Sequence, residues 1–174
     1  ELETAEEVHV LCLFAELSDA LAFEKIVKAA RAPIENRSDI YGRQVLCDED
    51  DEIIGFEPQL LVTATSIPIG SVPALVKKYN GAAIPAHVDR ESNSVISNLG
   101  FFLPEMDFQT IEVSQKLFGQ KRAEFLEKNR LMSYNVLMDS DAHYLEDIGS
   151  AGGTTEAVFS SKKQLVQLLC TAGL

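Results

Sequence analysis

Short apolar runs alternate with helical segments along the chain, and this alternation constrains the fold more than any other feature. Residues 8–14 form an almost continuous apolar run, which is typical of a strand buried on both faces. Residues 18–30 then place apolar side chains at helical spacing, with Ser18 as the expected N-cap. The alternation also predicts strands at 82–86, 110–113, 135–138 and 155–159, helices at 71–80, 94–99, 120–129 and from Ser160 or Ser161 onward, and a hairpin at 43–57. It therefore indicates a single α/β domain over residues 1–174.

Composition narrows the class of protein. With 174 residues, of which 46% are hydrophobic, the chain is long enough for one buried core. The net charge of −12 disfavours an extended nucleic-acid partner, which normally needs a basic surface. No apolar stretch approaches the roughly 20 residues of a membrane span, and no signal-like leader opens the sequence. The three cysteines are widely spaced and odd in number, as expected of reduced thiols, so the chain is predicted to be cytoplasmic and not bound to a membrane.

All three histidines lie beside apolar runs. His143 stands two residues after Asp141, directly beyond the run that ends at Met138. His87 follows the run 82–86, and His9 lies inside the run 8–14. Imidazole and carboxylate are the ligand set for zinc, manganese or iron, and they suit metal-assisted hydrolysis. The competing interpretation is that each histidine is only structural.

The positions of the histidines relative to the strands favour a (β/α) barrel. Such barrels carry functional residues just beyond the carboxyl ends of their strands. His87, Asp141 and His143 fit that rule, but His9 lies near the beginning of its run. Either this strand enters the barrel in an unusual way, or His9 points into the barrel from below the rim.

Three pieces of the sequence resemble one known family. They are Glu1 with the following 7–11 segment (Glu-Val-His-Val-Leu), the segment 84–87 (Ile-Pro-Ala-His) and the segment 140–144 (Ser-Asp-Ala-His-Tyr). In this order they resemble the C-terminal part of the PHP domain, the polymerase and histidinol phosphatase superfamily of metal-dependent phosphoesterases. The resemblance implies a distorted (β/α)7 barrel with two or three divalent ions (manganese, iron or zinc). The resemblance also implies that the metal ligands are Glu1, His9, His87, Asp141 and His143.

The chain departs from the family at its beginning. Members start with a His-x-His, an Asp and an Asp-His ahead of the glutamate, and none of these precedes Glu1. We therefore expect an incomplete barrel that lacks its first βα units and that is inactive alone. A missing N-terminal segment or a second chain would complete it.

The resemblance also implies the reaction, which is hydrolysis of a phosphate ester on a small phosphorylated substrate or a nucleotide. Arg90 could bind the substrate phosphate, or it could form a surface ion pair with Asp89 or Glu91. Asp139 and Glu112 could orient ligand imidazoles, or they could serve only in capping and loop hydrogen bonds. Three other functions stay open: a related barrel amidohydrolase, a non-catalytic metal-binding regulatory module, and a structural α/β domain without metal.

Overall fold

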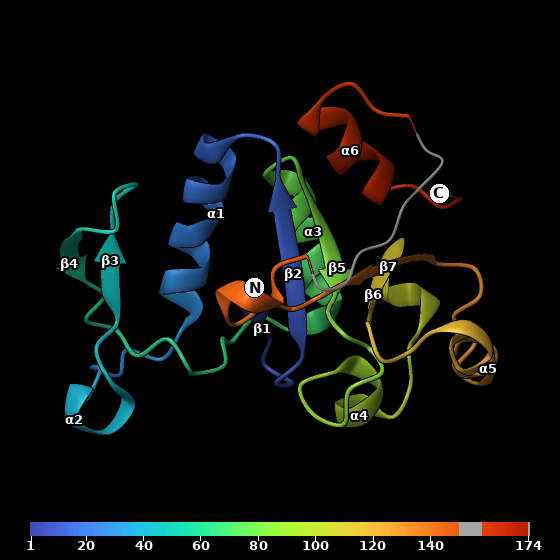
Figure 1. Cartoon of the computed structure of the whole chain (residues 1–174), viewed down its shortest axis with the longest axis horizontal. Coiled ribbons are helices and arrows are strands. Elements are labelled where there is room, and N and C mark those ends of the chain that lie inside the picture. The colour runs from blue at the N-terminus through green and yellow to red at the C-terminus, as the bar shows by residue number, and fades with distance from the viewer. Residues whose placement is uncertain (150–157, 174) are drawn as a thin grey trace.

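The computed structural model describes residues 1–149 and 158–173 as a mixed α/β fold (Figure 1). The strands in this part of the chain are β1 (Leu2–Glu3), β2 (His9–Phe14), β3 (Val45–Cys47), β4 (Ile53–Phe56), β5 (Gly81–Pro85), β6 (Thr110–Ser114) and β7 (Asn135–Asp139). The α-helices are α1 (Leu17–Ala30), α2 (Ser38–Tyr41), α3 (Val72–Lys78), α4 (Val95–Leu99), α5 (Gly119–Lys128) and α6 (Lys162–Leu169). Short 3₁₀ helices cover Ile69–Ser71, Pro104–Met106 and Leu145–Asp147.

The central sheet has the strand order β1-β2-β5, and both pairings are antiparallel. Val10 is opposite Pro85 in the β2–β5 ladder, and the backbone N–H of Ala86 donates to the carbonyl of His9 at 3.0 Å. The start of β2 and the end of β5 therefore lie at the same edge of the sheet. This direction explains why His9 stands at the start of its strand while His87 follows the end of another.

A second, parallel sheet pairs β6 with β7, and α5 forms the crossover between them. β6 lies beside the segment that follows β5, because the backbone N–H of Val88 donates to the carbonyl of Glu112 at 2.9 Å and the backbone N–H of Ser114, the last residue of β6, donates to Asp89 at 2.7 Å. The ends of β5, β6 and β7 and the start of β2 are thus brought together. None of the sheets in the described residues is closed into a barrel, and the barrel stays a prediction.

The buried side chains form a large cluster and a small one. The large cluster packs the inner faces of β1, β2 and β6 against α1, α3 and α5, with Val10, Val76 and Ile111 among its buried members. The small cluster packs α6 onto β5 through Ala82, Ile84, Val166 and Leu169, as Figure 1 shows by the position of α6 beside the central sheet.

The segment between α1 and the 3₁₀ helix at Ile69 extends from this core as an arm, which we define as residues 32–64. It contains α2 and the antiparallel β3–β4 hairpin (Figure 1). Two antiparallel bridges hold its base, one between Arg31 and Thr65 and one between Glu35 and Gln59. The arm begins and ends beside β1, because the backbone N–H of Thr65 donates to the carbonyl of Glu3 at 3.0 Å.

Most predicted elements are confirmed to within two residues, including the hairpin and the helix capped by Ser161. The N-cap at Ser18 is wrong, because α1 begins at Leu17 after Glu16. Burial of 8–14 on both faces is also wrong, since Leu13 is 38% exposed. Of the last predicted strand, residues 155–157 lie outside the described residues and 158–159 are not a strand. No helix in the described part is long and apolar enough to cross a membrane.

Candidate metal centre

The first group of site residues comes from the strands of the central sheet, and we call it the strand cluster (Glu1, His9 and His87). Glu3 is opposite His9 in the β1–β2 ladder, so Glu1, two residues earlier, lies diagonally from His9 on the same face. His87 reaches this place because it follows β5 at the same edge. The fold therefore gathers three residues that are up to 86 positions apart, from Glu1 to His87.

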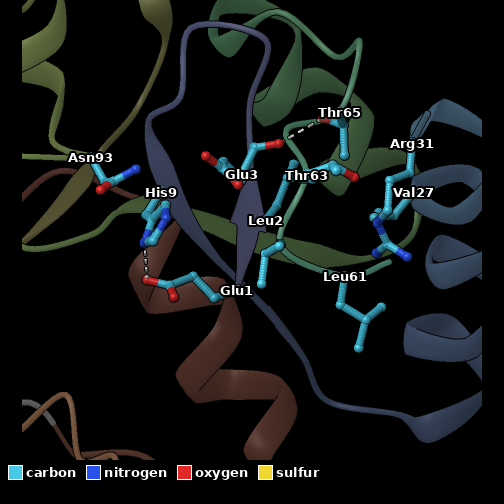
Figure 2. A pocket seen from close by; sticks show the side chains of 11 residues that line it. Glu1, Leu2, Glu3, His9, Val27, Arg31, Leu61, Thr63, Thr65 and Asn93 are labelled. Atoms are coloured by element: carbon cyan, nitrogen blue, oxygen red, sulfur yellow. Dashed lines mark hydrogen bonds and ion pairs between the residues drawn. The ribbon is translucent and has the colours of Figure 1, made fainter. Parts of the chain in front are cut away.

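The side chains of the strand cluster converge closely. Glu1 Oε1 lies 3.2 Å from His9 Nδ1 and 3.5 Å from His87 Nε2. The two imidazole rings stand edge to face with their centroids 5.4 Å apart. One ligand atom from each residue lies within 4.8 Å of the others, which is close enough for the three to share one ion. Figure 2 shows Glu1 and His9 pointing toward each other at one end of a pocket.

Burial and charge couple Glu1 to His87. The hydrogen bond to His87 is the largest influence on Glu1 and lowers its pKa to about 2, against the opposing effect of burial. Burial of His87, which is only 2% exposed, would by itself lower the pKa of the imidazole. The hydrogen bond to Glu1 and the negative charge of Glu112 outweigh this and raise the pKa of His87. Without a metal, the cluster is thus held together by the hydrogen bond and the charge attraction between the Glu1 carboxylate and the His87 imidazole.

Glu112 is an acidic side chain inside the core. It lies at the centre of β6, is only 1% exposed, and its Oε1 has no hydrogen-bond partner among the described residues. Burial, followed by the negative charge of Asp139, raises the pKa of Glu112 to about 7. His87 Nδ1 is likewise buried without a partner there. Buried polar atoms without hydrogen-bond partners lower the stability of the folded protein. Such atoms commonly mark a missing ion or a functional role.

The second group lies beyond β7, and we call it the loop cluster (Asp139, Asp141 and His143). Asp139 accepts a hydrogen bond from the backbone N–H of Asp141 at 3.0 Å, which forms a tight turn after the strand. Arg90 forms an ion pair with Asp141 across the site. The ring of His143 is exposed, and its Nδ1 lies 2.8 Å from the carbonyl oxygen of Asp141. Of the loop cluster, Asp139 and Asp141 act electrostatically on Glu112, whereas His143 faces solvent.

The backbone is strained where the site residues leave their strands. His87 has a φ of 31° and Asp141 a φ of 44°, both in the left-handed region that side-chain-bearing residues rarely adopt. Such strain persists only where the surroundings hold it, and it is concentrated at functional sites. Asp89 holds the first of these turns, since it accepts hydrogen bonds from the backbone N–H and the hydroxyl of Ser114 at 2.7 and 2.6 Å.

A pocket of about 380 Å³ opens beside the strand cluster (Figure 2). Glu1, His9 and Asn93 line one end, and Arg31 and Thr63 line the side formed by the foot of the arm. In Figure 2, Arg31 and Leu61 lie across the pocket from His9. The strand cluster therefore has an adjoining space large enough for part of a small molecule.

The structure brings together only part of the predicted ligand set. Glu1, His9 and His87 converge, and Asp141 lies at the same edge in an ion pair with Arg90. Sequence reasoning assigned Glu112 only a supporting role and missed Arg31. A charged residue in the middle of the apolar run 110–113 is a signal for Glu112, but no local pattern marks Arg31.

The strand cluster fits a divalent metal by its chemistry. Two imidazoles and one carboxylate with an open side form the ligand set of catalytic zinc sites, and they also accept manganese and iron. The unpartnered atoms of His87 and Glu112 beside it agree with a site built for added positive charge. Comparison with known proteins assigns no family, because no family model matches the chain and neither curated proteins nor solved structures give a significant match.

Proposed function

We propose that this chain carries the metal centre of a metal-dependent phosphoesterase of the PHP type. One observation carries the proposal: Glu1, His9 and His87 converge within 4.8 Å at an edge where Asp141 and Arg90 also lie. In this proposal the strand cluster holds a first ion, and the loop cluster contributes ligands to a second. The proposed ions are manganese, iron or zinc. When bound, such ions lower the pKa of a water and neutralise charge on phosphoryl oxygens.

The chain's own residues have separate roles in this proposal. Arg90 is 43% exposed, and its planar guanidinium is paired with the carboxylate of Asp141. Phosphoryl oxygens present the same geometry to this fork, so Arg90 can bind substrate phosphate in place of Asp141. Glu112 supports the site from inside the core, where its charge favours positive charge on His87. His87 and Asp141 both have positive φ values, which we propose are tolerated because the site needs these backbone turns.

Several features are part of the proposal through the family resemblance alone. These are the distorted (β/α)7 barrel, the N-terminal segment or second chain that completes it, the further ligands that this part supplies, and the role of His143 as a ligand. A small phosphorylated substrate or a nucleotide, and a cytoplasmic location, belong to the same set. Activity is therefore to be measured on the full-length protein, meaning the product of the whole reading frame.

The test compares Glu1→Gln with Glu49→Gln in the full-length protein. Both changes remove one negative charge, but Glu49 lies in the exposed tip of the arm's hairpin. We expect Glu1→Gln to lower bound manganese or zinc, measured by mass spectrometry, and to cut hydrolysis of p-nitrophenyl phosphate by at least about tenfold. Glu49→Gln should change neither quantity.

The alternatives give different outcomes in the same experiment. Metal that depends on Glu1 but turnover only of amide substrates would replace the phosphoesterase by an amidohydrolase. Metal that depends on Glu1 without turnover of any phosphate ester or amide would indicate the non-catalytic metal-binding module. Equal metal content in Glu1→Gln and the unaltered protein would contradict the metal centre itself.

A further inference from the structure

The pocket next to the strand cluster has a charge pattern that the metal centre does not explain. One end carries Glu1 and His9, and the opposite side carries the cation Arg31, while Glu3 lines the pocket between His9 and Thr65 (Figure 2). The wall between them is partly apolar, with Val27, Leu61 and Val62. A molecule bound at the metal centre would therefore extend along an apolar wall toward a positive charge.

The backbone of Arg31 is fixed while its side chain is available. The Arg31 backbone N–H donates to the carbonyl of Val27 at 3.1 Å, and its backbone forms the bridge to Thr65. Within the described residues, the guanidinium has neither an ion pair nor a hydrogen bond. Arg31 is thus held in position at the pocket with its five donors unused by the fold.

Glu57, an acidic side chain on which Arg31 acts electrostatically, is already paired with another cation. The pKa of Glu57 is lowered most by its hydrogen bond to Lys28, then by a backbone hydrogen bond, and least by Arg31. Lys28 forms the ion pair with Glu57 at 2.8 Å. Arg31 is therefore not needed to balance the charge of Glu57. The guanidinium of Arg31 is free to bind an anion in the pocket.

We propose that the pocket binds the leaving group of the phosphate ester, and that Arg31 selects leaving groups that carry a second anionic group, a carboxylate or a phosphate. This inference rests on the proposed function, since it assumes that the reacting phosphate lies at the metal centre. A guanidinium binds either oxyanion through two parallel hydrogen bonds.

The foot of the arm is then a specificity element. Arg31, Leu61 and Thr63 all lie in the two chain segments that connect the arm to the core. The hydroxyl of Thr65 is held by the carbonyl of Glu3 at 2.7 Å, which ties this foot to the strand that carries Glu1. The arm and the metal centre are therefore positioned relative to each other by β1.

The test measures binding of non-hydrolysable phosphonates to the manganese-loaded full-length protein by calorimetry. The probes are a series of carboxyalkylphosphonates, the matching bisphosphonates, and uncharged alkylphosphonates of the same chain lengths. We expect at least one chain length at which the carboxylate or the bisphosphonate binds about tenfold or more tightly than the alkylphosphonate, the scale of a charge-assisted hydrogen-bond pair. The two charged series distinguish a carboxylate-bearing from a phosphate-bearing leaving group.

Arg31→Gln should abolish this preference while leaving alkylphosphonate binding unchanged. Glutamine keeps the backbone bonds of Arg31, and Arg43→Ala, an exposed arginine of the arm, is the matched control that should retain the preference. Equal binding of charged and uncharged probes to the unaltered protein, or a preference that survives Arg31→Gln, would overturn the inference. Failure of the proposed function has another signature: alkylphosphonates would then bind without needing manganese or Glu1, or would not bind.

Discussion

The strand cluster and the loop cluster are both built from histidine and carboxylate, but the fold holds them differently. Glu1 directly precedes β1 and His9 begins β2, two strands that pair with each other, and the ladder between β2 and β5 sets where His87 emerges. The loop cluster depends on one turn after β7, and its histidine is 71% exposed, against 2% for His87. Side chains on paired strands are positioned before any ligand arrives, whereas those on a loop are positioned partly by what they bind.

The two clusters also differ in how the negative charge of their carboxylates is balanced. In the strand cluster, negative charge on Glu1 is shared with two imidazoles. In the loop cluster, negative charge on Asp141 is balanced by Arg90, a cation that the proposed reaction needs elsewhere. The strand cluster is therefore ready for an ion, while the loop cluster must exchange partners to bind one.

The largest expected effect separates one histidine of the strand cluster from the histidine of the loop cluster. His87→Gln should weaken manganese or zinc binding by more than about a hundredfold, beyond the ten- to hundredfold loss typical of residues that only support a ligand. His143→Ala should weaken it by no more than about tenfold, because the ring faces solvent. Calorimetric titration of both variants measures this, with circular dichroism to confirm that each is folded. Equal losses would show that the loop cluster closes on the ion as firmly as the strands do.

The next effect concerns Glu112, which lies behind both clusters. Its pKa is raised from 4.5 to about 7, so the folded protein retains a proton that the unfolded chain releases between these pH values. The metal-free protein should therefore lose stability as pH rises from 4.5 to 7, by up to about 3 kcal/mol at 1.36 kcal/mol per pKa unit. Glu112→Gln carries no charge to bury and should remove this loss.

Urea denaturation of metal-free protein at pH 5 and pH 8 measures the effect of Glu112→Gln. The variant should be more stable than the unaltered protein at pH 8 and similar to it at pH 5. Glu49→Gln at the exposed tip should not change the difference between the two pH values. If Glu112→Gln keeps the full loss between pH 5 and pH 8, the charge of Glu112 is not what destabilises the metal-free site.

The alternation of strands and helices, and the placement of His87 and Asp141 just beyond strands, could be predicted from the sequence. Both depend on local patterns, namely runs of apolar residues and the turns that end them. The direction of β2 was not predicted, because the almost continuous apolar run 8–14 is typical of a parallel strand buried on both faces, whereas β2 pairs antiparallel with both of its neighbours. That direction is what places His9 beside His87.

Contacts between distant parts of the chain account for the rest of what the sequence did not show. Glu112 was visible as an acid in an apolar run, but its raised pKa arises from burial in the folded core and then from the negative charge of Asp139, which lies outside that run. Arg31 reaches the pocket because Thr65 and Glu3 hold the foot of the arm against β1. Neither arrangement leaves a periodic signal in the residues around it.

The smallest expected effect tests the ion pair that occupies the loop cluster. A double-mutant cycle of Arg90→Ala and Asp141→Asn in the metal-free protein should give a coupling free energy of about 0.5–1 kcal/mol, since Arg90 is 43% exposed and solvent screens the pair. The matched cycle of Arg37→Ala and Asp39→Asn, an ion pair on the exposed arm, should give no measurable coupling. Saturating manganese should remove the coupling between Arg90 and Asp141, because a carboxylate that ligates an ion no longer needs the guanidinium. Coupling that persists unchanged with manganese would mean that Asp141 remains paired with Arg90, and it would leave the strand cluster as the only metal-binding part of this chain's site.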